Sequence, residues 1–540
     1  MKNQPYPLYE LPVITDLKDM VVKRAEETPD EICFTFPVSR DVTGEKTCKE
    51  FLDDINALGT MLYSLGYRNK KIAIMGENSY EWIVTFLACA NGGNIAVPLD
   101  KELEPKDLRE LMKMVECDTV FASKRCVKKF NEYDGLTVYN FSNFDGLISS
   151  GRQMIKNGDT EFIDYKVRPE KTAAIFFTSG TTGRSKAAML SNRNIASDIN
   201  SSCRNFRLDG DTLSVLPFHH TFGLITAVFM VFNYRHQVYI EKSMKNIQRD
   251  LKNVKPAMMF MVPLILESFY KRIMAQAQNE GKYDKLIRGM KISDRLLKIG
   301  IDRRKTMFSQ ITDVFGGNLD TVICGGAFLD EKYISAFRSW GVKILNGYGI
   351  TECSPVLAVN RNDYIIPGSV GQVIDADEVK IADDGEILVK GANIFEGYYN
   401  DPKDTEMSFD HGWYHTGDLG RLGENNVLFI TGRKKNLIIL SNGENISAEM
   451  IEQRIYDNIP YVKEVVCYGE EGKITAEVYL DPDVSDAEQN IQRDIDNLNK
   501  TGKLNTMIGK VKLRVQEFEK TTTQKIKRIG REQKNDGKTD

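Results

Sequence analysis

The sequence lacks the cysteine arrangements that mark disulfide frameworks and zinc sites. Its nine cysteines are scattered, odd in number and never spaced CxxC. A disulfide framework uses an even set, and a structural zinc site uses closely spaced pairs. The first twenty residues also lack the basic region and apolar core of a signal peptide. We therefore expect a reduced, cytoplasmic setting.

Long apolar runs and an excess of one charge are also missing. The longest apolar run, residues 224–232, is far shorter than the ~20 residues that span a membrane. Peripheral contact with the inner face of a membrane stays open. The net charge of −4 gives no whole-protein argument for nucleic-acid binding. Partners must be deduced from individual sites, and the oligomeric state, monomer or homodimer, stays open.

The chain is long enough for at least two domains, because 540 residues exceed what one hydrophobic core usually supports. Helical and strand-like patterns alternate through the first two thirds, with amphipathic or apolar helices at 53–65 and 81–93. The expected strands are 71–76, 94–99, 173–177, 258–263, 321–326 and 342–349. This β-α-β alternation predicts a doubly wound α/β architecture up to about residue 360.

From about residue 361 the pattern changes to short strands and tight turns. EVKIADDGEILVKG (378–391) predicts a hairpin with Asp384 and Gly385 at its tip, and GENNVLFITG (423–432) is a second hairpin candidate. We expect a small β-barrel-like subdomain at 361–432. It would complete a large N-terminal domain over residues 1–432.

Residues 433–540 predict a separate, small α+β domain. NLIILSNG (436–443) is typical of a strand, and Ser447 can cap a helix that places Ile451 and Ile455 on one face. VKEVVCYGEEGKITAEVYL (462–480) predicts a hairpin. After about Arg531 we expect a frayed terminus.

The stretch FFTSGTTGRSKAAML (176–190) combines five hydroxyl side chains, two glycines, an arginine and a lysine. It is not a Walker loop, because Gly183 is followed by Arg-Ser-Lys-Ala, and it contains no GxGxxG. Its glycines still let successive N–H groups converge on an anion, and its lysine adds charge. The candidate phosphate ligands are Thr178, Ser179, Gly180, Thr181, Thr182, Gly183 and Lys186. Taken alone, the stretch is also compatible with a solvent-exposed loop.

Six stretches, in order, resemble the adenylate-forming enzymes, the family of acyl-CoA synthetases, acyl-adenylating domains and luciferases. They are TSGTTGRSK (178–186), GGA (325–327), NGYGITE (346–352), YHTGDLG (414–420), GRKKNLIILSNGENISAEMIE (432–452) and TTTQKIKR (521–528). The resemblance spans nearly the whole chain. It implies a site for ATP with Mg²⁺.

The resemblance assigns roles within NGYGITE and GGA. Tyr348 would stack on adenine, and Thr351 would lie near the α-phosphate. Glu352 would hold Mg²⁺ with ATP, since a hard cation prefers oxygen ligands. The remaining nucleotide-binding positions are Gly325, Gly326, Ala327, Gly347 and Gly349.

The resemblance also implies a ribose site. Asp418 would accept hydrogen bonds from both ribose hydroxyls, and Arg433 would be their second partner. An isolated Gly-Asp pair is most often just a turn.

A mobile C-terminal domain is implied by the remaining motifs. Lys525 would reach the substrate carboxylate and the α-phosphate during adenylation, Lys435 would be the hinge, and Gly443 would border the CoA pantetheine arm. Two departures stand out: Gln524 replaces the usual glycine, and Ser185-Lys186-Ala187 replaces the usual Pro-Lys-Gly. Gln524 puts the local backbone conformation in question, because only glycine reaches positive φ freely. Lys525 is retained, so we expect an active enzyme.

The substrate prediction depends on a missing charge. Amino-acid-activating relatives hold the ammonium group with an acidic side chain, yet TLSVLPFHHTFGLITAVFMVFNYR (212–235) contains no Asp or Glu. A buried, unpaired ammonium would be costly. The segment instead suits an alkyl tail, with a core helix as an equal alternative. His220 matches the family's pocket histidine, whereas for His219 we favour a structural histidine.

HGWYHTGDLG (411–420) and the following GRKK stretch closely resemble the signature of fatty acyl-CoA synthetases, with Ala448 where proline is common. This implies a long-chain fatty acid:CoA ligase. ATP would activate the fatty acid as acyl-AMP with release of pyrophosphate, and the CoA thiol would then displace AMP. One alternative is an acyl-AMP ligase that loads an acyl carrier protein. Another, prompted by Gln524, is a nucleotide-binding protein that has lost catalysis.

Overall fold

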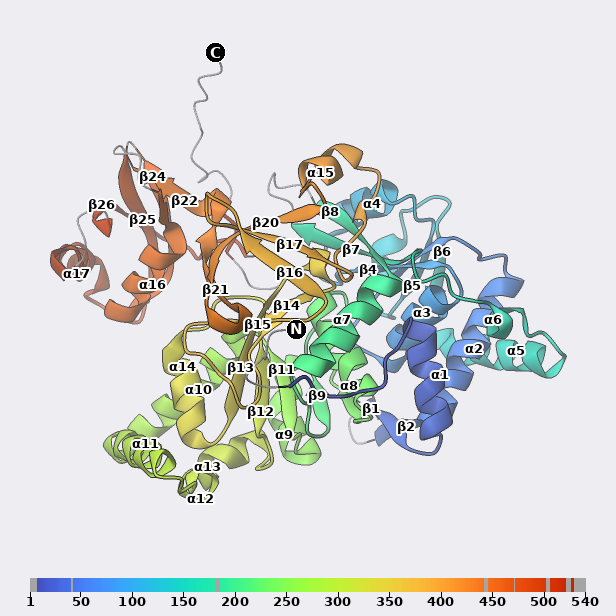
Figure 1. Cartoon of the computed structure of the whole chain (residues 1–540), viewed down its shortest axis with the longest axis horizontal. Helices are drawn as coiled ribbons and strands as arrows, with labels where there is room; N and C mark the ends of the chain where they lie inside the picture. Colours follow the sequence, from blue (N-terminus) through green and yellow to red (C-terminus); the bar gives the residue numbers. More distant parts are fainter. Residues whose placement is uncertain are drawn as a thin grey trace, which may run out of the picture.

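The computed structural model describes residues 7–39, 42–179, 185–440, 445–470, 472–501, 506–520 and 526–528. Two large β-sheets with their helices make up the first part of the chain. A smaller α+β unit, coloured orange to red in Figure 1, lies at one end of the molecule.

The seven-stranded sheet contains the first predicted strands. Its order is β18 (Gly397–Tyr398), β8 (Ser185–Ser191), β7 (Thr172–Ser179), β4 (Ile95–Leu99), β3 (Lys71–Met75), β5 (Thr119–Ala122) and β6 (Thr137–Asn140). Pairing from β7 to β6 is parallel, whereas β8 is antiparallel to β7 and to β18. Along β3, Ile72 and Ile74 enter one buried core while Ala73 and Met75 enter another. The sheet is therefore covered on both faces, which confirms the predicted doubly wound α/β class.

Four helices of this first region begin at a side-chain cap, made by Asp16, Thr47, Ser79 and Ser191. The helices of the region are α1 (Leu17–Glu27), α2 (Cys48–Ser64), α3 (Tyr80–Asn91), α4 (Pro105–Met114), α5 (Phe144–Lys156), α6 (Glu161–Asp164) and α7 (Asn192–Asn205). Thr47 and Glu50 form a capping box at the start of α2, so this helix begins before the predicted residue 53.

The second large sheet joins a parallel half to an antiparallel half. The parallel strands are β1 (Ile32–Ser39), β10 (Val238–Ile240), β9 (Thr212–Ser214), β11 (Met258–Met261), β12 (Thr321–Cys324) and the first part of β13 (Lys343–Gly349). At the far edge, β2 (Val42–Thr47) pairs antiparallel with β1. Within β13, Asn346 pairs in parallel with Cys324, and the next residue, Gly347, pairs antiparallel with Val359. The motif NGYGITE therefore lies where the two halves of the sheet meet.

The antiparallel half holds the predicted β-rich subdomain. Its strands are β14 (Val356–Val359), β15 (Gly371–Val373), β16 (Asp377–Ile381), β17 (Glu386–Gly391), β19 (Phe409–Asp410), β20 (Trp413–Leu422) and β21 (Val427–Arg433). The predicted 378–391 hairpin is confirmed as β16 and β17. The second hairpin prediction was wrong in extent, because residues 427–433 form one strand whose partner is the preceding β20. Among the described strands no pairing closes a barrel, since β14 pairs with β13 and so extends the large sheet.

The helices around the second sheet are mostly those between its parallel strands. They are η3, a π-helix (Phe222–Met230), α8 (Val231–Asn233), α9 (Ile247–Val254), α10 (Pro263–Asn279), α11 (Tyr283–Lys298), α12 (Arg304–Met307), α13 (Ser309–Thr312), α14 (Glu331–Trp340) and α15 (Pro402–Met407). Short 3₁₀ turns are η1 (Val127–Phe130), η2 (Phe141–Asn143), η4 (Met244–Asn246), η5 (Asp313–Phe315), η6 (Thr351–Cys353), η7 (Glu424–Asn426) and η8 (Lys434–Asn436). No helix in these described ranges is both long enough and apolar enough to cross a membrane.

The last unit has its own buried core. Its elements are β22 (Leu437–Ile439), β23 (Asn445–Ser447), α16 (Ala448–Asn458), β24 (Val462–Glu470), β25 (Lys473–Leu480), α17 (Ala487–Thr501) and β26 (Ile508–Arg514). As predicted, the Ser447 side chain caps α16, and Ile451 and Ile455 are buried on one face. The predicted 462–480 hairpin is confirmed as β24 and β25. The domain boundary at residues 432 and 433 stays a prediction.

Candidate functional site

A cavity of about 1230 Å³ lies between the two large sheets, beside the point where β13 changes partners. It is larger than a typical single-ligand pocket of about 300–1,000 Å³, so it has room for more than one ligand. Most of the predicted site residues line it. They are Thr178, Lys186, His220, Gly325, Gly326, Ala327, Gly347, Tyr348, Gly349, Thr351, Glu352 and Arg433.

Some predicted residues lie elsewhere. Asp418 is not part of the cavity lining but lies directly behind Tyr348, and Lys435 is exposed in η8. Gly180, Thr181, Thr182, Gly183, Gly443, Gln524, Lys525 and the side chain of Ser179 lie outside the described residues. The roles assigned to these positions stay predictions.

Asp418 connects the predicted adenine and ribose residues. It is 2% exposed, and its Oδ2 accepts a 2.6 Å hydrogen bond from the Tyr348 hydroxyl. Its Oδ1 lies 2.8 Å from Arg433 Nε. Burial, together with the neighbouring Asp418 carboxylate, raises the pKa of Tyr348 well above its ordinary value, so the tyrosine is a neutral donor. The Asp418 carboxylate is thus held by side chains from two other strands, β13 and β21.

Glu352 lies in η6, directly after β13, and faces the cavity while only 9% exposed. The Tyr398 hydroxyl donates a 3.0 Å hydrogen bond to its Oε1. Burial raises the pKa of Glu352. Within the described residues no three His, Cys, Asp or Glu side chains are grouped to hold a metal ion. Mg²⁺ usually takes one or two carboxylates plus substrate phosphates, so Glu352 fits as the protein ligand of a magnesium–ATP complex.

Lys186 and Thr178 lie side by side because they are paired in register across the β7–β8 hairpin. The predicted phosphate loop is thus the connection between these two strands. The Lys186 ammonium is 2.7 Å from Asp404 Oδ2 and 4.7 Å from the centre of the Tyr398 ring. A bound phosphate would therefore share or replace the contact between Lys186 and Asp404.

The cavity wall around His220 comes from the segment predicted to hold the substrate tail. Phe222, Gly223 and Thr226 line the cavity, whereas most of the apolar run 224–232 is buried in the core. The pocket and core-helix interpretations therefore each hold for part of the segment. A methyl group on Gly223 would lie 2.2 Å from the Pro217 carbonyl oxygen, so this close approach requires glycine.

His219 has more contact with the site than expected of a structural histidine. It lines the cavity, with its Nε2 3.4 Å from Asp100 Oδ2 and its ring centre 4.2 Å from that of His220.

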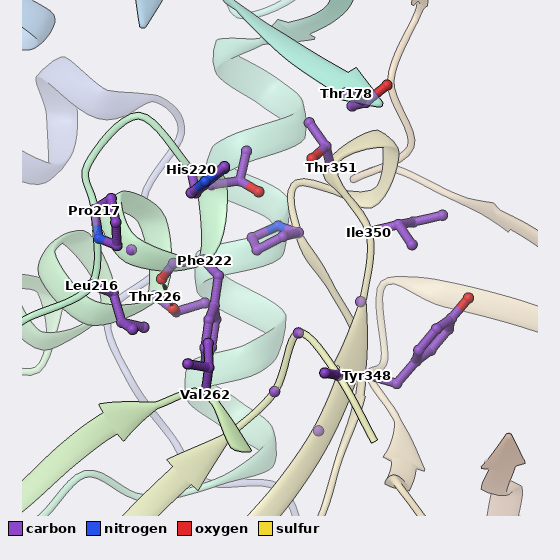
Figure 2. Close-up of a pocket in the computed structure, with 18 of the residues that line it drawn as sticks. Thr178, Leu216, Pro217, His220, Phe222, Thr226, Val262, Tyr348, Ile350 and Thr351 are labelled. Atoms are coloured by element: carbon purple, nitrogen blue, oxygen red, sulfur yellow. Dashed lines mark hydrogen bonds between the residues drawn. The ribbon is translucent and has the colours of Figure 1, made fainter. Parts of the chain in front are cut away.

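Apolar side chains form one part of the cavity wall. Figure 2 shows Leu216, Phe222 and Val262 gathered on one side, and Thr178 and Thr351 on the other. The ring of Phe222 packs edge-on against Phe260, which also lines the cavity. One continuous space thus joins an apolar wall to the predicted nucleotide-binding residues.

Comparison with known proteins agrees with this geometry. Residues 21–399 match the family model described as AMP-binding enzyme. The chain belongs to the AMP-binding enzyme family.

Named relatives cover most of this AMP-binding enzyme. It is 30% identical over 473 residues to long-chain-fatty-acid–CoA ligase 5 of Mus musculus, covering 78% of this chain and 68% of that protein. It is 27% identical over 497 residues to long-chain-fatty-acid–CoA ligase FadD15 of Mycobacterium bovis, covering 86% and 82%.

Solved structures share the fold. O-succinylbenzoate coenzyme A synthetase from Bacillus subtilis in complex with AMP superposes with a TM-score of 0.74 at 22% identity, covering 96% of this chain and 98% of that one. ATP-bound MatB from Rhodopseudomonas palustris gives a TM-score of 0.74 at 22% identity, covering 95% and 97%.

Several cavity residues of this AMP-binding enzyme were not predictable from the sequence motifs. Asp404 and Tyr398 belong to no motif that was singled out, so only their spatial position reveals them. His415 and Thr416 stand inside YHTGDLG, where the family resemblance implies a role only for their neighbour Asp418. Glu386 directly follows the predicted hairpin tip. That its side chain faces the cavity could not be predicted from the sequence.

Proposed function

We propose that this enzyme joins a long-chain fatty acid to coenzyme A, converting ATP to AMP and pyrophosphate. The observation that carries the proposal is one cavity whose lining includes both the apolar wall of Leu216, Phe222 and Val262 and the predicted nucleotide-binding residues Tyr348 and Glu352. An alkyl tail and a nucleotide can be held there with the carboxylate between them. The names of the mouse and mycobacterial relatives support the same substrate class.

The first step is attack of a carboxylate oxygen on the α-phosphorus of ATP, in line with departing pyrophosphate. The Tyr348–Asp418–Arg433 group would hold the nucleoside, and Lys186 would neutralise phosphate charge. Thr351, Lys525 and His220 would act beside the reacting carboxylate and α-phosphate. Magnesium held through Glu352 supplies positive charge to the phosphates.

The second step replaces AMP by a thiol. Acyl-AMP is a mixed anhydride whose leaving group is AMP, so the CoA sulfur can attack the acyl carbon without forming free oxide. We further propose that residues 433–540 form a domain that rotates about Lys435, bringing Gly443 beside the pantetheine arm and removing Lys525 from the site.

A panel of carboxylic acids, assayed for AMP release with ATP and CoA, tests the substrate class. We expect palmitate and similar chains to give the highest kcat/KM, with short, aromatic and dicarboxylic acids far lower. Preference for malonate or an aromatic acid would contradict the proposal. A parallel assay with holo acyl carrier protein tests which thiol accepts the acyl group. A thioester formed only on the carrier protein would show that the carrier, and not CoA, is the acceptor.

A further inference from the structure

The buried side chain of Glu386 contacts two segments of the site, β20 and η8, that are separated in sequence. It stands at the start of β17, is 3% exposed and lines the cavity. Its Oε1 accepts a 2.9 Å hydrogen bond from the backbone N–H of Gly417. Its Oε2 lies 3.0 Å from His415 Nδ1 and 2.8 Å from Lys434 Nζ. One carboxylate thus contacts both β20 and η8.

On the β20 side, Glu386 stabilises an irregular piece of backbone. The pairing of β17 with β20 shifts register between Glu386 and Leu388, and Gly417 has φ of +71°, a left-handed conformation that favours glycine. The Gly417 N–H would otherwise lack the ladder hydrogen bond that a regular strand provides. Because Gly417 directly precedes Asp418, this contact holds the backbone next to the predicted ribose carboxylate.

On the η8 side, Glu386 holds Lys434, the residue between Arg433 and the predicted hinge Lys435. Lys434 Nζ also lies 2.6 Å from Asp384 Oδ2 at the β16–β17 turn. Burial alone would raise the pKa of Glu386, but Lys434, His415 and the Gly417 N–H together hold it below its ordinary value. The carboxylate is therefore charged at neutral pH, and its contact with Lys434 is a charge-assisted one.

We propose that Glu386 is a positioning residue that fixes both members of the Asp418–Arg433 pair and keeps them fixed when the C-terminal unit rotates at Lys435. Gly417 orients Asp418 from one side, and Lys434 anchors the end of β21 next to Arg433 from the other. Lys434 directly precedes the predicted hinge Lys435. Because Glu386 anchors Lys434, the backbone rotation of the C-terminal unit is confined to the residues after Lys434. The inference rests on the proposed function and on the predicted hinge.

Glu386→Gln tests this role, because the amide retains an acceptor for Gly417 but loses the charge that holds Lys434. We expect the KM for ATP, measured by pyrophosphate release with palmitate, to rise about tenfold while kcat changes little. The Kd for AMP, measured by calorimetry without any fatty acid, should rise similarly. Lys434→Met should have a comparable effect, and the double variant should be no worse than either single one.

Asp54→Asn is the matched control. Asp54 is 2% exposed and lies 2.8 Å from Lys46 Nζ, and it is not part of the cavity lining. We expect its substitution to lower the melting temperature without changing the Kd for AMP. If Glu386→Gln behaves the same way, or if its effect simply adds to that of Lys434→Met, the positioning role is overturned.

The AMP measurement separates this inference from the proposed function. If no fatty acid supports pyrophosphate release by the wild-type protein, the proposed function fails. The Kd for AMP in the Glu386→Gln, Lys434→Met and double variants still decides the role of Glu386.

Discussion

Asp418 and Arg433 are directly paired across the neighbouring strands β20 and β21, with Arg433 Nε 2.8 Å from Asp418 Oδ1. The tight connection at Gly423 to Asn426 brings these two residues into register. The Tyr348 hydroxyl adds a third side chain from β13, the strand where the two halves of the sheet meet. The residues predicted to bind adenine and ribose therefore contact one another directly through Asp418.

Asp418→Asn should weaken nucleotide binding without affecting the fatty acid. The amide loses the charge that pairs with Arg433 and presents fewer acceptors to a ribose. We expect the KM for ATP to rise at least tenfold and the KM for palmitate to stay within about twofold. Initial-rate measurements of pyrophosphate release check this, and an unchanged KM for ATP would remove Asp418 from the ribose site.

Asp404→Asn should lower the KM for ATP, whereas Asp418→Asn should raise it. Its carboxylate now holds Lys186 at 2.7 Å, and that contact must be shared or replaced when phosphate binds. Removing the competing charge should lower the KM for ATP about two- to threefold, since a half-buried ion pair is worth roughly 1 kcal/mol or less. Glu406→Gln, an exposed change on the same helix α15, is the control and should leave the KM unchanged. A higher KM in Asp404→Asn would mean that Asp404 positions Lys186 instead of competing for it.

Val262→Trp should reduce activity on long-chain acids more than on short-chain acids. Val262 belongs to the apolar wall in Figure 2, so a larger ring there would occupy space needed by a long tail. We expect kcat/KM to fall at least tenfold for palmitate but less than about threefold for hexanoate. Equal losses for both acids, or a raised KM for ATP, would place the tail elsewhere.

The Glu241 carboxyl should make stability depend on pH in an unusual direction. Burial, together with its contact to Asp250, raises the pKa of Glu241 from 4.5 to about 7. Between these values the folded protein binds more protons at this group than the unfolded chain, so stability falls as pH rises from about 4.5 to 7. Glu241→Gln has a neutral side chain at both pH values. The difference in free energy of unfolding between this variant and the wild type should therefore be more favourable to the variant at pH 8 than at pH 5, by on the order of 1 kcal/mol. Urea unfolding at both pH values measures this difference, and an identical gain at both would contradict it.

Local patterns were enough to predict several strands and helices, whereas the members of the site came from the resemblance to a family. The alternation of strands and helices, the Ser447 cap and the Asp384–Gly385 turn depend on neighbouring residues, so the sequence contains them directly. Residues of the family motifs meet in one cavity because most lie at or directly beyond the ends of strands β7, β12, β13 and β21.

Long-range pairing was not predictable in the same way. The strands after residue 361 extend the large sheet through β14 instead of closing on themselves, and this depends on which distant edge is free. The same limit hid the contacts of Lys186 with Asp404 and of Glu386 with Lys434, since each joins segments far apart in sequence. Side-chain direction, which decides these contacts, follows from the folded backbone.

Transfer of an oxygen isotope tests the central claim most directly. Palmitate labelled with ¹⁸O in its carboxylate should be incubated with the enzyme, ATP, magnesium and CoA, and the products analysed by mass spectrometry. Attack of the carboxylate on the α-phosphorus leaves one labelled oxygen on AMP when the thiol displaces it, and the other in the thioester carbonyl. The account predicts labelled AMP and labelled palmitoyl-CoA in equal amounts. Unlabelled AMP, or label in inorganic phosphate, would contradict it.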